Sequence, residues 1–215
     1  MKPGHCARQT AIALALLAGS ALSVAAGAGE VAGILAGLAK DREARAVAIH
    51  DGEKTASFCA NCHGSSGVSA IPEVPNLAAQ HPAYLLKQIE AFAAGTRKNP
   101  FMEGLMKALS PHERAQLVLY YATRPAPDGI SGDAALVETG RTAYAGLCAQ
   151  CHGADGHGDA NVPRLAGQQE AYLRLNLKRY LTMSGERIYA PMTAQVTKLG
   201  EGRIDAVVAY LRTLP

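Results

Sequence analysis

The chain has 215 residues, of which 48% are hydrophobic and 18% charged, and its formal net charge is +3. This length allows one or two domains of ordinary globular composition. Without Lys2 and Arg8, which lie in the leader described next, 19 basic and 18 acidic side chains remain. A balance so close to neutral argues against a nucleic-acid-binding surface. Partners should therefore recognise local patches rather than a strong overall field.

Residues 1–28 have the order of a secretory signal, with basic residues, an apolar run from Ala11 to Ala26 and small residues ending at Ala28. We expect cleavage after Ala28, because small residues occupy the positions that signal cleavage requires. The alternative is an uncleaved anchor, since apolar character continues to Ala39 and is then long enough to span a membrane. The alanine and glycine content favours cleavage. A retained segment would associate the protein with the membrane surface.

Residues 29–50 form an N-terminal extension that is rich in alanine and charged in its middle. They have no counterpart in the second half of the chain. We expect them to be helical or partly disordered, and the sequence assigns them no function.

A Cys-x-x-Cys-His motif occurs twice, at Cys59–His63 and at Cys148–His152. Two thiols at this spacing can add to the vinyl groups of one haem, and the following histidine then lies under the iron. A zinc site would leave the histidines without a role and would bring the cysteine pairs within roughly 20 residues, whereas these pairs are 89 apart. The spacing therefore predicts two covalent haem c groups with His63 and His152 as axial ligands. The thioether residues would be Cys59, Cys62, Cys148 and Cys151.

The halves remain similar after the motifs, since Pro75–Leu85 matches Pro163–Leu173 at an offset of 88. Each half continues with a helix after this segment and closes with another. The closing helix of the first half should open at Ser110, where Ser110-Pro111-His112-Glu113 forms a capping box. The expected helices cover residues 82–95 and 169–185, and then begin at 110 and near 200.

These repeats predict two tandem domains, residues 51–124 and 134–215, separated by a linker at 125–133 that is rich in proline, glycine and aspartate. Neither half shows a strand pattern. Domains of this size are marginal on their own hydrophobic core. A covalently held haem would fill each interior, and the protein without haem should fold poorly.

The sixth iron ligand should be methionine, because a neutral thioether raises the potential relative to a second histidine. Met102 and Met192 stand at equivalent positions, 39 and 40 residues after their proximal histidines. Met106 and Met183 have no counterpart in the other half, and core packing suits them better. We therefore favour Met102 and Met192 as the axial ligands.

Each methionine of this pair follows an arginine by five residues, Arg97 or Arg187. The forked guanidinium suits pairing with a haem propionate, although a solvated charge remains the alternative. Tyr84 and Tyr172 could pack at the haem edge with bonded hydroxyls, or fill the core.

From Asp51 to Pro215 the chain resembles the dihaem cytochrome c4 family. The matching features are the Cys-x-x-Cys-His-Gly motifs, the Pro-x-Leu-Ala segments, the Tyr-Leu helices and the methionine before the last helix. The resemblance implies an all-α protein with a class I cytochrome c fold in each half. It also implies that the carbonyls of Pro75 and Pro163 accept the Nδ1–H of the proximal histidines, which fixes their orientation and raises their basicity.

Members of that family are periplasmic one-electron carriers without catalytic residues, and the resemblance implies transfer toward a terminal oxidase. Partners would be redox proteins such as a membrane oxidase or a quinol-oxidising complex. The alternative is a dihaem subunit of a periplasmic dehydrogenase, such as a flavocytochrome c sulfide dehydrogenase, which uses the same fold and ligands. A haem enzyme would need an open sixth position, which the paired methionines disfavour.

Overall fold

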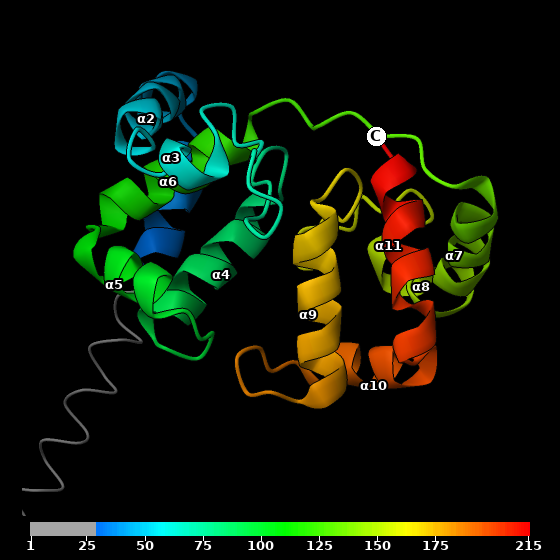
Figure 1. Cartoon of the computed structure of the whole chain (residues 1–215). Helices are drawn as coiled ribbons and strands as arrows, with labels where there is room; N and C mark the ends of the chain where they lie inside the picture. The colour runs from blue at the N-terminus through cyan, green and yellow to red at the C-terminus, as the bar shows by residue number, and fades with distance from the viewer. Residues whose placement is uncertain (1–28) are drawn as a thin grey trace, which may run out of the picture.

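The computed structural model describes residues 29–215, so the signal expected at residues 1–28 lies outside the described residues. All regular elements in the described range are helices. They form two groups joined by an extended segment (Figure 1). Each group surrounds one Cys-x-x-Cys-His motif.

The first group begins with a helix over residues 29–38. It continues with α2 (Arg42–Thr55), α3 (Ala60–His63), α4 (Pro82–Ala93), α5 (Pro100–Ala108) and α6 (Pro111–Ala122). The second group consists of α7 (Ala134–Leu147), α8 (Ala149–His152), α9 (Glu170–Thr182), α10 (Ala190–Leu199), the short 3-10 helix η1 (Glu201–Arg203) and α11 (Ile204–Thr213).

Side chains at the helix starts explain several of these boundaries. The capping box expected at Ser110 and Glu113 is present, with both reciprocal hydrogen bonds formed at the start of α6. The Asp41 carboxylate accepts from two backbone N–H groups of α2, and Asp133 does the same for one N–H of α7. Such caps satisfy N–H groups that have no partner inside the helix.

The opening and closing helices of each group cross in contact, α2 with α6 and α7 with α11. A glycine lies at each crossing because the backbones leave no room for a side chain. A Cβ atom on Gly52 would lie 2.5 Å from the carbonyl oxygen of Gln116, and one on Gly140 only 1.8 Å from that of Ala206. The whole of α2 is thus the counterpart of α7. Residues 42–50, which the sequence comparison left in the extension, belong to this helix.

Each group has its own hydrophobic core. In the first group it is formed by Ala56, Leu85, Leu117, Val118, Tyr120 and Tyr121. In the second it is formed by Ala143, Tyr144, Leu173, Leu199, Ile204, Val207, Val208 and Leu211. The motif cysteines Cys59 and Cys148 pack against these clusters, so that the predicted haem attachment points adjoin the cores.

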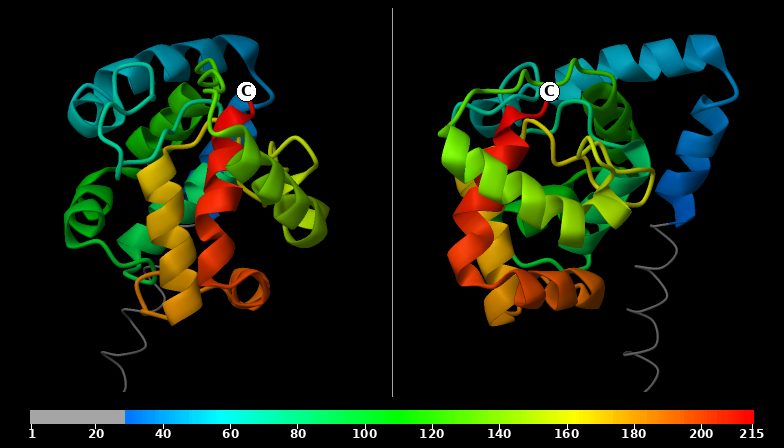
Figure 2. Two further views of the ribbon diagram at one scale, coloured as in Figure 1. Left: turned by 45° about the vertical axis from the view of Figure 1, so that its right-hand side comes forward. Right: turned by 90° about the vertical axis from the view of Figure 1, so that its right-hand side faces the viewer.

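The helix at residues 29–38 belongs to the first group. Its Val31 is fully buried, and its Leu35 packs against the first core. Apolar side chains at these positions and at Ile34 and Leu38 recur at helical spacing, which gives the helix one buried stripe. In the right-hand view of Figure 2 this helix, in blue, runs along the outer edge of the first group. None of the helices within residues 29–215 is both long and apolar enough to cross a membrane.

The short helices α5 and α10 were not expected from the sequence. In α5 the side chain of Asn99 accepts from the Met102 N–H at 3.0 Å, and Pro100 occupies the first turn. An asparagine followed by proline is a helix-start signal, so α5 could have been found. α10 has no side-chain cap and gave a weaker signal.

The candidate haem sites and the interface between them

Each predicted proximal histidine lies on its own single helical turn, α3 or α8, which ends at a glycine. Gly64 and Gly153 each have φ of 77°, a conformation that side chains disfavour. A Cβ on Gly64 would also lie 2.0 Å from the carbonyl oxygen of Val68. The turn is therefore tight, and it leaves His63 8% exposed and His152 4% exposed.

One ring nitrogen of each histidine is engaged by the backbone. The Nδ1 of His63 lies 2.9 Å from the carbonyl oxygen of Pro75, and that of His152 lies 3.0 Å from the carbonyl oxygen of Pro163. A carbonyl only accepts, so Nδ1 carries the proton and Nε2 keeps its lone pair. Burial lowers the pKa of both imidazoles, while the backbone bonds oppose this. Each ring is thus neutral and held at Nδ1 by the backbone, which leaves Nε2 available to bind a metal.

The four motif cysteines are unpaired in the structure, and Cys151 is exposed. Burial raises the pKa of the Cys59 thiol, and it raises that of Cys148 to about 11. Within residues 29–215, no three histidine, cysteine or acidic side chains meet in a way that could hold a metal ion.

The methionines separate into two kinds. Met102 and Met192 lie in the first turns of α5 and α10 and are both partly exposed. Met106 is buried at 3% exposure, and its counterpart in α10, Val196, is equally buried. Valine cannot bind iron, so this position could not supply a ligand in both domains. Met106 is therefore a core residue, as expected. Met183 is 74% exposed, so the expectation of core packing is wrong for that residue. It ends α9 in a left-handed conformation.

Arg97 and Arg187 meet between the two groups of helices. Arg97 donates to the Tyr172 hydroxyl at 2.9 Å, and Arg187 donates to the same hydroxyl at 3.0 Å. Arg187 also donates to the hydroxyl of Tyr84 in the other domain. These side chains are partly buried, so neither arginine is the solvated charge considered above, and both tyrosines have bonded hydroxyls.

The electrostatics of this cluster are unbalanced. Burial alone would raise the pKa of Tyr172, but the two guanidinium groups lower it to about 7. Burial alone would lower the pKa of Arg187, but the surrounding tyrosines favour its charge and raise the pKa above its ordinary value. Among the described residues, neither arginine pairs with a carboxylate. Two partly buried cations at one hydroxyl call for an anion, and a haem propionate has the matching chemistry.

Gln80 and Gln168 also cross this interface, although nothing in the sequence had assigned them a role. Each binds the backbone of the other domain through both atoms of its amide. The sequence feature that could have drawn attention to them is their equivalent position, since both occur at the same place in the repeated Leu-Ala-x-Gln segment. What they bind could not be inferred, because it depends on how the domains face each other.

A family model for cytochrome c matches residues 49–124 and 137–215. The chain belongs to the cytochrome c family. Cytochrome c4 from Azotobacter vinelandii is 33% identical over 186 residues, which cover 76% of this chain and 87% of the relative. The thiosulfate dehydrogenase electron acceptor of Thiomonas intermedia is 32% identical, with 74% and 80% covered. The structure of reduced cytochrome c4 from Pseudomonas stutzeri gives a TM-score of 0.71 at 28% identity, with 77% and 98% covered.

Within the cytochrome c family, the chain is of the dihaem cytochrome c4 type, as its resemblance predicted. It has two cytochrome c domains and binds two covalent haem c groups. The all-α fold class is likewise confirmed. The assignment of individual ligands and propionate partners remains a prediction, which the buried histidines and the carboxylate-free arginines support.

Proposed function

We propose that this cytochrome c is a periplasmic one-electron carrier that passes electrons between respiratory partners, toward a terminal oxidase. The observation that carries the proposal is the arginine cluster at the interface. Arg97 and Arg187 come from different domains and converge on one hydroxyl, and within residues 29–215 neither forms an ion pair with a carboxylate. This arrangement suits two haems whose propionates meet near the interface, so that an electron entering one domain can leave from the other.

Haem c supplies an iron that alternates between the ferrous and ferric states. The chain's own contribution is to hold it in place. In this proposal Cys59, Cys62, Cys148 and Cys151 bind the macrocycle covalently, while His63 and His152 present Nε2 to the iron. Met102 and Met192 would each supply the second protein ligand, and an iron held by both residues would have no position for an exchangeable ligand. A closed site favours electron transfer over catalysis.

The arginines also adjust the potential. A guanidinium beside a propionate neutralises the charge of the propionate. Less negative charge near the iron favours the ferrous over the ferric state, so the potential is higher than with an unpaired propionate. The pKa of Arg187 is raised by its neighbours, so its charge persists throughout the physiological range. Arg97 and Arg187 would therefore raise both potentials and screen the two haems from each other.

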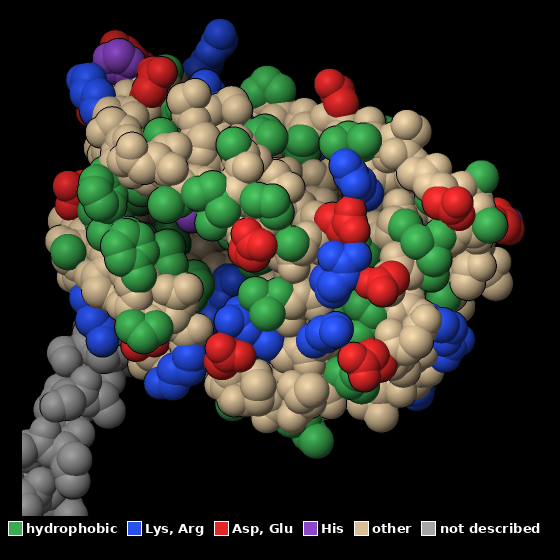
Figure 3. All heavy atoms as spheres, in the orientation of Figure 1, with side chains coloured by type: hydrophobic (Ala, Val, Ile, Leu, Met, Phe, Trp, Pro, Cys, Tyr) green, Lys and Arg blue, Asp and Glu red, His purple; other side chains and the backbone are tan. Residues whose placement is uncertain are grey.

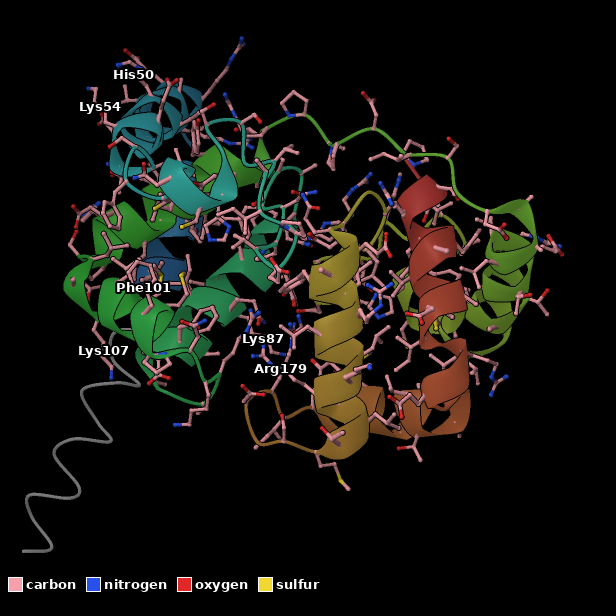
Figure 4. All side chains as sticks on the ribbon, in the orientation of Figure 1. His50, Lys54, Lys87, Phe101, Lys107 and Arg179 are labelled. Atoms are coloured by element: carbon pink, nitrogen blue, oxygen red, sulfur yellow. The ribbon has the colours of Figure 1, made fainter. Side chains whose placement is uncertain are left out.

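A protein partner needs an apolar place to dock near a haem. Phe58 and Phe101 are 58% and 59% exposed, and they adjoin Cys59 and Met102 in the sequence. Hydrophobic side chains gather around a hollow on the face of the first domain that Figure 3 shows. Figure 4 places Phe101 on α5, with Lys107 farther along the same helix. Exposed apolar surface of this kind marks interaction sites, which supports exchange with protein partners.

A second candidate is the electron-accepting subunit of a periplasmic dehydrogenase. The similarity to a protein named thiosulfate dehydrogenase electron acceptor supports it. Both candidates use the same haem sites and differ in the partner. The sulfide dehydrogenase alternative belongs to the same class.

The test uses the purified protein with both haems attached. Ferrous protein is mixed with carbon monoxide while the Soret band is followed, and reduced protein is then offered a membrane oxidase preparation. We expect no carbon monoxide binding and rapid oxidation by the membranes. Prompt binding of carbon monoxide would contradict a pure carrier. Slow oxidation, together with recovery of the protein in a fixed ratio with a dehydrogenase, would favour the second candidate.

A further inference from the structure

Two glutamine side chains cross the interface, and each binds both polar atoms of one backbone residue. The Oε1 of Gln168 accepts from the Asn76 N–H at 2.7 Å, and its Nε2 donates to the Asn76 carbonyl at 2.9 Å. In the reverse direction, the Oε1 of Gln80 accepts from the Arg164 N–H at 2.9 Å. Its Nε2 donates to the Arg164 carbonyl at 3.1 Å.

The peptide groups that these glutamines hold are the ones that orient the proximal histidines. The N–H of Asn76 and the C=O of Pro75 belong to a single amide, and that carbonyl accepts from His63. The N–H of Arg164 likewise belongs to the amide whose Pro163 carbonyl accepts from His152. One amide therefore links the ring of one domain with the glutamine of the other.

The surroundings make these bonds rigid. Gln80, Gln168 and Asn76 are only 6%, 7% and 6% exposed, so water cannot readily replace the contacts. Each Oε1 also accepts from the N–H of the next residue in its own chain segment, at 2.9 Å for Gln169 and 3.2 Å for His81. These residues are the N-caps of α9 and α4. The amides are thus fixed to the starts of two helices.

We infer that Gln80 and Gln168 are positioning residues that tune the proximal histidine of the opposite domain. This inference rests on the proposed ligation by His63 and His152. An amide whose N–H donates to a strong acceptor becomes a better acceptor at its own carbonyl, since hydrogen bonds in a chain polarise one another. A stronger bond to Nδ1–H makes the imidazole more basic. A more basic ligand stabilises ferric iron, so each glutamine lowers the potential of the haem across the interface.

The test replaces each glutamine by methionine, which has a similar length and no amide. Potentials are measured in the two-haem protein by an NMR-followed redox titration, with each haem assigned through contacts to its own domain. Gln168→Met should raise the potential of the first haem and leave the second unchanged. Gln80→Met should do the reverse. The Nδ1–H signal of the affected histidine in ferrous protein should move to lower chemical shift.

Gln169→Met is the matched control. Gln169 donates across the same interface to the Ser69 carbonyl at 2.5 Å and to the Asn76 side chain at 3.3 Å. It does not touch the Pro75–Asn76 amide through its side chain, so its loss should weaken the interface without moving either potential. Thermal unfolding of all variants separates a loss of interface stability from a change in haem potential. If Gln168→Met does not fold, Gln168→Asn keeps an amide but is one methylene too short, and it should shift the first haem in the same direction.

The inference is supported if each glutamine variant raises the potential of the haem in the opposite domain while Gln169→Met changes neither potential. A shift in the haem of the substituted domain, an equal shift in both haems, a fall, or no shift in a folded variant would overturn it. Failure of the proposed function has a different signature. It would appear in the unsubstituted protein, as a haem content other than two or as carbon monoxide binding.

Discussion

In the first domain the hydroxyl of Tyr120, on the closing helix α6, donates to the carbonyl of Ser65 at 2.7 Å. In the second domain Tyr144, on the opening helix α7, donates to the carbonyl of Gly153 at the same distance. Both carbonyls belong to the loop that follows the haem motif. In both domains a buried tyrosine hydroxyl thus binds a carbonyl of this loop, but the tyrosine comes from a different helix in each.

The surroundings of the two cores differ more widely. The first domain is covered by the apolar stripe of the helix at residues 29–38, with Val31 at 0% exposure. The second is bordered by ion pairs, in which Arg174 binds Glu170 and Asp205 at 2.6 Å each. By contrast, the contacts that hold the histidines are nearly identical in both. The two halves share the frame around the histidine and differ in the outer layer.

The helix crossings give the largest expected difference. Gly140→Ala places a Cβ against the Ala206 carbonyl, so α7 and α11 must separate. We expect a loss of about 3 kcal/mol or more in the stability of the second domain. Gly52→Ala, with the longer approach of 2.5 Å, should cost the first domain less. Thermal unfolding followed by circular dichroism measures both.

Gly146→Ala is the control for this pair, because it lies in the same helix as Gly140 with no atom within 4 Å of its added Cβ. It should leave the unfolding temperature unchanged or slightly raised. Equal losses in Gly52→Ala and Gly140→Ala would mean that the two crossings are energetically alike despite their different spacing.

Replacement of the predicted axial methionines tests whether the two iron frames are equivalent. Met102→Leu and Met192→Leu should each remove the methionine-to-ferric-iron band from one haem only. Each should lower that haem's potential by a few tenths of a volt, within the roughly 0.8 V that axial ligands span. Optical redox titration provides the measurement. A similar effect of Met106→Leu or Met183→Leu would transfer the ligand role to that residue.

The N-terminal helix should stabilise the first domain alone. Val31→Ser buries a hydroxyl and loses apolar contacts, which costs about 2 kcal/mol. Amide hydrogen exchange should show faster opening of α4 and α6, with α9 and α11 unaffected. Ala32→Ser, at an exposed position of the same helix, serves as the control. Equal loss of protection in both domains would show that the helix acts on the whole molecule.

The ion pairs of the second domain should give the smallest effect. Arg174 is partly exposed, so Arg174→Met should cost at most about 1 kcal/mol at neutral pH. The hydrogen bond from Arg174 lowers the pKa of Glu170 below its ordinary value of 4.5. The stability gained is therefore full above that value and is lost as pH falls through the folded pKa. Urea unfolding of variant and wild type should differ at neutral pH and converge in acid. A difference that persists in acid would contradict this.

How much was visible in the sequence depended on how local each feature is. The Cys-x-x-Cys-His motifs and the Ser110–Glu113 capping box involve neighbours in the chain, and the structure places them as expected. Met183 is exposed and follows α9 in a left-handed conformation, neither of which its residue type indicates. The bonds of Gln168 to Asn76 join residues 92 apart. They depend on the relative orientation of the two domains, which no local sequence pattern indicates.

The exchange of equivalent groups across the interface is the contact pattern of two identical subunits related by a two-fold axis. Gln80 and Gln168 occupy equivalent positions, and each binds the backbone of the other's domain. One domain therefore carries both sides of this contact, and a half-chain made alone presents the surface needed to pair with a second copy of itself. Since the glutamines bind only backbone atoms, their own bonds set no requirement on the side chains at these two positions. Asn76 and Arg164 differ at such a position, where joining the copies into one chain allows divergence without loss of assembly.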